Sequence, residues 1–196
     1  MIKYLFVNTI TTFSLILGLI AIFFVIDGSF YLSFGFALLA LVCDSLDGYF
    51  ARLLRAESYF GSIFDTIADI VVYLSYPAVV LYFYFGLNNF IGLLFIMIFI
   101  ISGIYRLIKF TNNSFTVEGV KKYYNGMPVF FSHIMIMIMV LFSLFNKNLL
   151  QITGSLLLVM ISIMMITKYK FRKPDGGVLI ISLIVILSLS ICMFNL

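Results

Sequence analysis

The sequence predicts an all-α integral membrane protein, a bundle of about seven transmembrane helices with a cytoplasmic N-terminus. The first observation is composition, since 64% of the 196 residues are hydrophobic and only 10% are charged. An ordinary soluble domain carries roughly 25% charged residues. The second is a mean hydropathy of +1.21. The third is a series of apolar runs about as long as the roughly 20 residues needed to cross a bilayer.

Seven apolar runs can be recognised, separated by segments rich in Gly, Asn or charged residues. They cover 5–26, 30–54, 60–85, 90–110, 127–145, 149–167 and 177–195. The first run is too long for a signal peptide and has no small-residue cleavage site, so we expect it to be a retained helix. Because no linker is long or polar enough to separate domains, residues 1–196 are predicted to form a single membrane domain.

The cations support this helix count. With a cytoplasmic N-terminus and seven alternating helices, eleven of the twelve Lys and Arg residues fall on the cytoplasmic side and only Lys147 falls outside. Cytoplasmic loops carry such an excess of cations. The sequence therefore predicts a multi-pass protein of the cell membrane. The net charge of +4 comes without a basic cluster interleaved with aromatic residues, which argues against a nucleic-acid partner.

Four acidic residues, Asp44, Asp47, Asp65 and Asp69, lie within or at the edge of apolar helical runs. A carboxylate at the centre of a transmembrane helix costs about 2.5–3.5 kcal/mol, and less near the interface. Asp44 and Asp47 are three residues apart, whereas Asp65 and Asp69 are four apart, so each pair lies on one helix face. Because a short cytoplasmic connection joins the two helices, all four carboxylates can meet near the cytoplasmic interface.

Carboxylates so close together need a compensating cation. Ion pairs with Arg52, Arg55 or Arg106 would account for one or two acids, but not for four acids at helical spacing. Hard divalent ions prefer oxygen ligands, and Mg²⁺ is commonly held by a few carboxylates together with the phosphates of a substrate. The sequence therefore predicts a site for Mg²⁺ or Mn²⁺ that binds a diphosphate, with Ca²⁺ at a second site as an alternative.

Small residues lie between the acids on the same two helices, at Gly48, Ala51 and Gly61. Small residues allow a ligand or a neighbouring helix to approach the backbone, and either explanation is open for each of them. Arg52 ends the first half of the pattern. It either contacts a phosphate or anchors the helix end in the cytoplasm.

These residues form one pattern, D-x2-D-G-x2-A-R-x8-G-x3-D-x3-D, in which all eight fixed positions agree over 26 residues. The segments are Asp44-Ser-Leu-Asp47-Gly48-Tyr-Phe-Ala51-Arg52 and Gly61-Ser-Ile-Phe-Asp65-Thr-Ile-Ala-Asp69. The pattern resembles the signature of the CDP-alcohol phosphatidyltransferase family. The resemblance implies transfer of a phosphatidyl group from CDP-diacylglycerol, or an archaeal ether analogue, to the hydroxyl of a polar alcohol. CMP would be released.

The resemblance also implies roles for the acids. Asp44, Asp47 and Asp65 would hold one or two divalent ions against the CDP diphosphate. Asp69 would share a metal or act alone, and it would be the general base that takes the proton of the acceptor hydroxyl. Such a division of labour agrees with the chemistry of phosphoryl transfer, in which cations neutralise the leaving group and a carboxylate removes a proton.

Further residues are implied to bind the CDP-lipid. The set is Asn8, Thr11, Asp44, Gly48, Ala51, Arg52 and Gly61. Asn8 and Thr11 stand where the family has an N-x2-T element. Gly48 and Ala51 would leave room for the cytidine end, and Arg52 would contact phosphate. Many members of the family are dimers, so a homodimer is a further expectation from the resemblance.

The acceptor is indicated by two later segments. Tyr105-Arg106-Leu-Ile-Lys109-Phe110 and Asn125-Gly126-Met127-Pro128 resemble the R-L-A-R-F-N and G-L-P elements of phosphatidylserine synthases. This resemblance favours L-serine, with inositol phosphate, glycerol phosphate or choline as alternatives. Arg106 and Lys109 lie one helical turn apart. They either bind the acceptor's carboxylate or a lipid phosphate, or anchor the helix in the cytoplasm.

An ion-coupled membrane transporter is the alternative from another functional class, because intramembrane acids also mark ion pathways. Acids of that kind are expected near the midplane on several helices, whereas these cluster at one end of two adjacent helices. An enzyme is therefore the preferred prediction. His133, the single histidine, is expected inside the bundle as a hydrogen-bonding residue, and Cys43 and Cys192 are expected to be packing residues.

Overall fold

The structure is a computed structural model that describes residues 2–56, 58–112, 116–118, 121–145, 150–167 and 169–172. Its elements are α1 (Ile2–Ile26), α2 (Phe30–Leu53), α3 (Tyr59–Asp69), the π-helix η1 (Ile70–Ser75), α4 (Tyr76–Phe83), α5 (Phe90–Asn112), β1 (Thr116–Glu118), β2 (Lys121–Asn125), α6 (Phe131–Phe145), α7 (Leu150–Ile166) and β3 (Lys170–Arg172). Packing divides the described residues into two compact units, one ending at Val72 and the other beginning at Tyr73.

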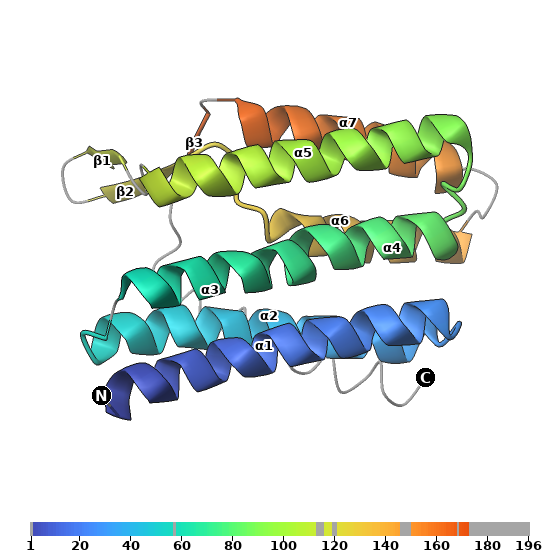
Figure 1. The fold of residues 1–196 in the computed structure, drawn as a ribbon. Coiled ribbons are helices and arrows are strands. Elements are labelled where there is room, and N and C mark those ends of the chain that lie inside the picture. Colours follow the sequence, from blue (N-terminus) through green and yellow to red (C-terminus); the bar gives the residue numbers. More distant parts are fainter. Residues whose placement is uncertain are drawn as a thin grey trace. The chain divides into compact units, whose positions relative to one another are not determined.

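The first unit contains α1, α2 and α3, with α1 and α2 lying side by side (Figure 1). Two buried hydroxyls join α1 to α2. Ser14 Oγ donates to the Ala40 carbonyl over 2.9 Å, and Ser33 Oγ donates to the Ala21 carbonyl over 2.7 Å. Ser14 and Ala21 are seven residues apart on α1, and their partners Ala40 and Ser33 are seven residues apart on α2 in the reverse order. The two bonds therefore define one antiparallel register.

The connection between α2 and α3 is a tight turn. Arg55 adopts a left-handed φ of +50°, and the N–H groups of Arg55 and Ala56 donate to the carbonyls of Arg52 and Ala51. These two bonds form the helix-ending pattern that usually has glycine at the left-handed position. Ser58 then caps α3, since its Oγ accepts a hydrogen bond from the Gly61 N–H at 3.0 Å. The turn thus brings the end of α2 close to the start of α3.

Helix α3, the π-helix η1 and helix α4 follow one another without a loop and form one helical run, Tyr59–Phe83. Pro77 lies in the first turn of α4. In a regular α-helix its ring would meet the carbonyl four residues earlier, at Tyr73, and it donates no hydrogen bond. A π-turn, in which the bonds reach one residue further, is one way for a helix to absorb this irregularity. The boundary between the two units, Val72 to Tyr73, falls inside η1.

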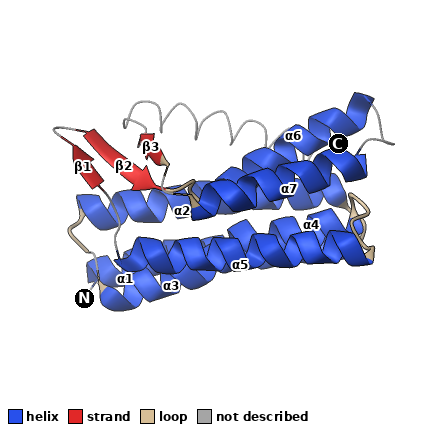
Figure 2. Ribbon diagram, turned by 90° about the horizontal axis from the view of Figure 1, so that it is seen from above, coloured by secondary structure: helices blue, strands red, loops and turns tan. Residues whose placement is uncertain are grey.

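The second unit contains α4 to α7 and a small antiparallel sheet in the order β1-β2-β3, drawn in red in Figure 2. Helix α7 packs against both α5 and α6, around buried residues such as Phe99, Ile136 and Leu158. The connection from β2 to α6 begins with Gly126, whose N–H donates to the Tyr169 carbonyl at 2.9 Å. This sheet was not predicted from the sequence.

Among the described residues, four helices are long and apolar enough to cross a membrane: Ile2–Ile26, Phe30–Leu53, Tyr59–Phe83 and Phe90–Lys109. Shorter apolar helices cover Phe131–Val140 and Thr153–Ile166. These six segments match the first six predicted runs, so a helical membrane protein is confirmed. The seventh run, 177–195, and Cys192 lie outside the described residues. A total of seven helices, the cytoplasmic N-terminus and the single domain stay predictions.

Candidate functional site

Three of the four predicted acids meet in the first unit. Asp44 and Asp47 from α2 and Asp65 from α3 each place a carboxylate oxygen within 4.8 Å of the others. Asp47 is only 3% exposed, and its Oδ2 has no hydrogen-bond partner among the described residues. A buried carboxylate oxygen without a partner is costly unless a cation compensates it. The oxygen-only donor set and this buried oxygen both fit a hard divalent cation.

The local sequence explains why these side chains converge. Asp44 and Asp47 are one helical turn apart near the end of α2, and Asp65 lies at the seventh residue of α3. The short capped turn between the helices returns the chain at the same end of the unit. Carboxylates at the end of one helix therefore face those near the start of the next, as the spacing predicted.

Helix α1 completes the surroundings of these acids. Thr11 lies one turn before Ser14 on α1, and Cys43 lies one turn after Ala40 on α2. In the antiparallel register set by the Ser14–Ala40 bond, Thr11 therefore lies opposite the part of α2 near Cys43. Thr11 is buried, lies within hydrogen-bonding reach of Asp47, and also donates to the Val7 carbonyl at 3.3 Å. The structure thus places the predicted Thr11 beside the acids, by way of a register that the sequence alone did not reveal.

Two glycines of the pattern lie next to polar side chains. A Cβ on Gly61 would stand 3.4 Å from Asn8 Oδ1 and 3.0 Å from Ser58 Oγ. A Cβ on Gly48 would stand 3.4 Å from Arg52 Nη1, so the guanidinium folds back over the glycine. Both glycines therefore have a polar side chain close to the backbone. Ala51 lies on the same helix and is half-buried.

Asp69 is the last residue of α3 and is half-buried. Within the described part of the chain it is not one of the three acids that share the 4.8 Å group. It lies one turn beyond Asp65 on the same helix and immediately before η1. The fourth acid thus follows the three-carboxylate group along the same helix.

The predicted acceptor residues lie in the second unit, on α5. Arg106 is 5% exposed, whereas Lys109 is half-buried. Arg106 shares a buried helix face with Ser102 and Gly103. A guanidinium buried in a membrane-spanning helix usually has a polar partner and a function. Simple anchoring at the cytoplasmic surface would leave Arg106 exposed, so its burial argues against that alternative.

The family profile described as CDP-alcohol phosphatidyltransferase matches residues 4–187 of this chain. The chain belongs to the CDP-alcohol phosphatidyltransferase family. It is 30% identical over 185 residues to a Helicobacter pylori protein named CDP-diacylglycerol–serine O-phosphatidyltransferase, covering 94% of this chain and 68% of the relative. A Methanocaldococcus jannaschii protein of the same name is 31% identical over 182 residues, with 93% and 81% covered. An archaetidylserine synthase from Methanothermobacter thermautotrophicus is 26% identical over 161 residues, with 81% and 66% covered.

Enzymes of the CDP-alcohol phosphatidyltransferase family depend in general on a divalent metal ion, and the three-carboxylate group offers ligands for one. The signature segment of the family, residues 44–69, is the part of the chain that carries this group. Family membership and local geometry therefore agree on where a metal would bind.

One polar cluster of this phosphatidyltransferase was not predicted from the sequence. His133, 3% exposed at the start of α6, lies in the interior of its unit, as expected. Its ring contacts Tyr73 with centroids 5.1 Å apart and Tyr76 with centroids 5.6 Å apart. Tyr73 belongs to η1 and Tyr76 begins α4. No spacing rule links residues 73 and 133, so only the folded structure reveals the contact.

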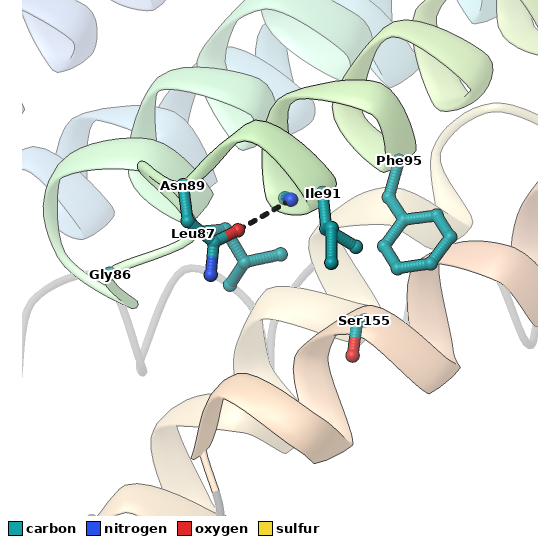
Figure 3. A pocket seen from close by; sticks show the side chains of 7 residues that line it. Gly86, Leu87, Asn89, Ile91, Phe95 and Ser155 are labelled. Carbon is teal, nitrogen blue, oxygen red and sulfur yellow. Dashed lines mark hydrogen bonds between the residues drawn. The ribbon is translucent and has the colours of Figure 1, made fainter.

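A small cavity of about 190 Å³ also lies in the second unit, at the turn between α4 and α5 (Figure 3). Gly86, Leu87, Asn89, Phe95 and Ser155 are among its lining residues. Asn89 Oδ1 accepts the Gly92 N–H at 2.7 Å as the cap of α5. The cavity therefore shows packing around a helix cap and no convergent set of reactive groups.

Proposed function

We propose that the chain transfers the phosphatidyl group of CDP-diacylglycerol, or of an archaeal ether analogue, to the hydroxyl of L-serine and releases CMP. The observation that carries this proposal is the group formed by Asp44, Asp47 and Asp65 within the family's signature segment. The choice of serine is supported by the names of the relatives from H. pylori, M. jannaschii and M. thermautotrophicus.

In this proposal Asp44, Asp47 and Asp65 hold the divalent ion, Mg²⁺ or Mn²⁺, with Ca²⁺ as the alternative at a second site. When bound, the ion neutralises charge on the diphosphate and on the departing CMP. Asp47 fits the role of an inner ligand, since its Oδ2 is buried and accepts no hydrogen bond from the described residues. Arg52, whose guanidinium lies over Gly48, offers an exposed cation to a phosphate of the same substrate.

The CDP-lipid is placed along the end of α2 and the facing part of α1. Gly48, Ala51 and Gly61 keep the backbone accessible to the nucleotide, and Asn8 and Thr11 supply polar groups beside it. These five residues approach from three helices of one unit. A ligand in contact with all of them would therefore have its diphosphate close to the three carboxylates.

Asp69 is proposed as the general base. It takes the proton from the serine hydroxyl as the oxygen forms a bond to the phosphatidyl phosphorus, and the bond from that phosphorus to the CMP oxygen breaks. Its position supports this role because it lies one turn from Asp65 but outside the three-carboxylate group of the described residues.

Recognition of serine is assigned to Arg106 and Lys109. A buried guanidinium can bind a carboxylate with two parallel hydrogen bonds, and a membrane interior strengthens such a pair. The next element, Asn125–Pro128, includes Gly126, which has a left-handed φ of +92°. A Cβ on Gly126 would stand 2.9 Å from the Met165 carbonyl oxygen, so glycine is required there. This requirement gives the G-M-P element a structural reason.

The location of the reaction is inferred from the charge distribution. An excess of cations on one side of the predicted helices supports an active site at the cytoplasmic face of the cell membrane, where CDP-activated lipid and serine are both accessible. A homodimer is part of the proposal only as an expectation from the family.

The test is CMP release by the purified protein in detergent with CDP-diacylglycerol and Mg²⁺ or Mn²⁺. Serine, inositol phosphate, glycerol phosphate and choline are supplied one at a time. Release that requires serine would support the whole proposal, while release with another acceptor would keep the reaction and replace serine. No release with any acceptor from folded protein would contradict the reaction and favour an ion-coupled transporter.

Two variants separate the assigned roles. Asp69→Asn should abolish turnover and leave CDP-lipid binding within a factor of about 2, because it removes a base with little change in shape. Arg106→Ala should raise the KM for serine more than that for CDP-diacylglycerol. Lys3→Ala, which removes an exposed cation from α1, is the matched control for lost positive charge. Retained turnover in Asp69→Asn, or an unchanged serine KM in Arg106→Ala, would contradict the respective role.

A further inference from the structure

We propose that His133 is a positioning residue for phosphatidyl transfer: by holding Tyr73 and Tyr76, it fixes the π-helical turn that comes directly after Asp69. The inference rests on the proposed function, in which Asp69 takes the proton of the acceptor. His133 itself is not placed against substrate. It acts through the helix that carries the base.

The π-helix makes the orientation of Asp69 depend on the next six residues of the chain, Ile70–Ser75. A π-turn contains one residue more than an α-turn, so it shifts the angular register of the helix by about 100°. Asp69 is the residue directly before η1, and Asp65 lies one turn earlier on α3. Relaxation of η1 to a regular α-helix would therefore change the hydrogen bonding of the turn that follows Asp69. π-Turns in helices occur frequently at functional sites.

Contacts within the second unit hold the later half of the turn. The ring of Tyr73 meets that of His133 edge-on, at an interplanar angle of 75°, and the ring of Tyr76 lies tilted against it at 32°. Tyr73, Tyr76 and His133 are all at most 3% exposed. One imidazole thus contacts two aromatic rings that are three residues apart on the run, which fixes both their spacing and their direction.

Glycines accommodate the turn on each side of the unit boundary. Within the first unit, a Cβ on Gly18 would stand 2.8 Å from Val72 Cγ2. Within the second, Leu74 fills the space left at Gly103, which could not hold a Cβ unless Leu74 moved. Successive residues of η1 are therefore closely packed against the unit to which each belongs, and His133 supplies the polar aromatic part of that packing.

A histidine is an unusual choice for a purely structural position here. An imidazole inside a membrane-spanning protein costs more than a phenylalanine of similar size, and such residues are usually retained for function. The neighbouring Ser132 is also fully buried, and its Oγ has no hydrogen-bond partner in the part of the chain that the structure describes. Ser132 and His133 come shortly after the Gly126–Pro128 element in the chain. Through the contact of Tyr73 with His133, η1 therefore meets the helix that begins just after the proposed acceptor element.

The test compares two products. In the purified full-length protein, phosphatidylserine formed and CMP released are measured in the same reaction, and their ratio reports whether serine or water accepts the phosphatidyl group. A misplaced base should lower kcat and admit water, which yields phosphatidic acid and CMP. For His133→Ala we expect kcat to fall on the order of 10-fold or more. The product ratio should also fall, while the KM for CDP-diacylglycerol changes little.

Two variants separate positioning from general destabilisation. His133→Phe keeps a ring between the tyrosines and should restore most of the product ratio. Ser162→Ala removes a buried hydroxyl that donates to the Leu158 carbonyl within α7, and it should leave the ratio unchanged. If His133→Ala fails to fold, Tyr76→Leu removes one of the same ring contacts from the opposite partner and should lower the ratio.

The outcomes are distinguishable. A product ratio unchanged in His133→Ala, or in Tyr76→Leu where that variant is needed, would overturn the positioning role even if kcat fell. His133→Phe as impaired as His133→Ala would overturn the part assigned to ring packing. Failure of the proposed function itself would appear already in the wild type, as absence of CMP release with every acceptor.

Discussion

Mutual repulsion among Asp44, Asp47 and Asp65 predicts that removing one carboxylate stabilises the metal-free protein. At the 4.8 Å limit of their separation, each pair of ionised carboxylates repels by about 3.5 kcal/mol at an effective dielectric constant of about 20, and a proton held by one of these buried groups relieves part of this repulsion. Asp47→Asn removes two of the three pairs with little change in volume. Solvent that reaches the half-buried Asp44 and Asp65 reduces the gain, so we expect a rise of about 1–3 kcal/mol in the free energy of unfolding with chelator.

The same substitution should remove most of the stabilisation by the metal. At a metal concentration about 100 times Kd, binding stabilises the wild type by about 2.7 kcal/mol. If losing one of three carboxylates lowers the affinity about 100-fold, the gain at that concentration falls to about 0.4 kcal/mol. The stability of Asp47→Asn relative to the wild type should therefore fall by about 2.3 kcal/mol between chelator and this metal concentration.

The assay is thermal unfolding in detergent, followed by far-UV circular dichroism because the chain contains no tryptophan. Chelator, Mg²⁺ and Mn²⁺ are compared. Asp27→Asn is the control, since Asp27 is an exposed acid in the turn between α1 and α2. An Asp47→Asn protein that is less stable than wild type in chelator, yet gains as much from metal, would refute the view that the three carboxylates form one cation site.

Further predictions concern stability and use the same unfolding measurement. Arg55→Gly should raise the unfolding temperature by relieving the left-handed φ of +50°, a gain of about 0.5–1 kcal/mol; a decrease would show that the arginine side chain holds the turn. Ser14→Ala should cost about 0.6 kcal/mol by removing the bond to Ala40, and an unchanged Tm would mean that water or lipid replaces it. Gly92→Ala should lower Tm clearly, because its Cβ would lie 2.6 Å from the Leu87 carbonyl oxygen; a neutral result would show that the turn can move aside.

The sequence predicted most reliably those features that depend only on the length of apolar runs or on the roughly 3.6-residue repeat of a helix. Apolar runs of bilayer length gave six helices within a few residues of their observed ends. Intervals of three and four residues brought Asp44, Asp47 and Asp65 to one place, because a helix repeats every 3.6 residues and the turn between the helices is short. The same spacing predicts that Asp69 joins them, and this stays a prediction.

Other features depend on contacts between distant parts of the chain. The π-helix shifts the register by one residue, and apolar periodicity over so short a stretch does not detect it, although Pro77 marks the region. The contact of His133 with Tyr73 joins residues from separate helices. The sheet formed by β1, β2 and β3 combines short strands from two separate segments, and strands of three to five residues carry little periodic signal.

The compactness of the metal site along the chain has a consequence for biogenesis. Asp44 and Asp65 are 21 residues apart, and every group proposed to touch the metal or the nucleotide precedes Ile70. Contacts between residues near in sequence need little loop closure and form early. We therefore expect the carboxylates to assemble while the later helices are still emerging from the ribosome. A divalent ion bound at that moment would neutralise the charged hairpin as it settles into the bilayer, so metal supply would affect how much protein is inserted as well as how fast it works.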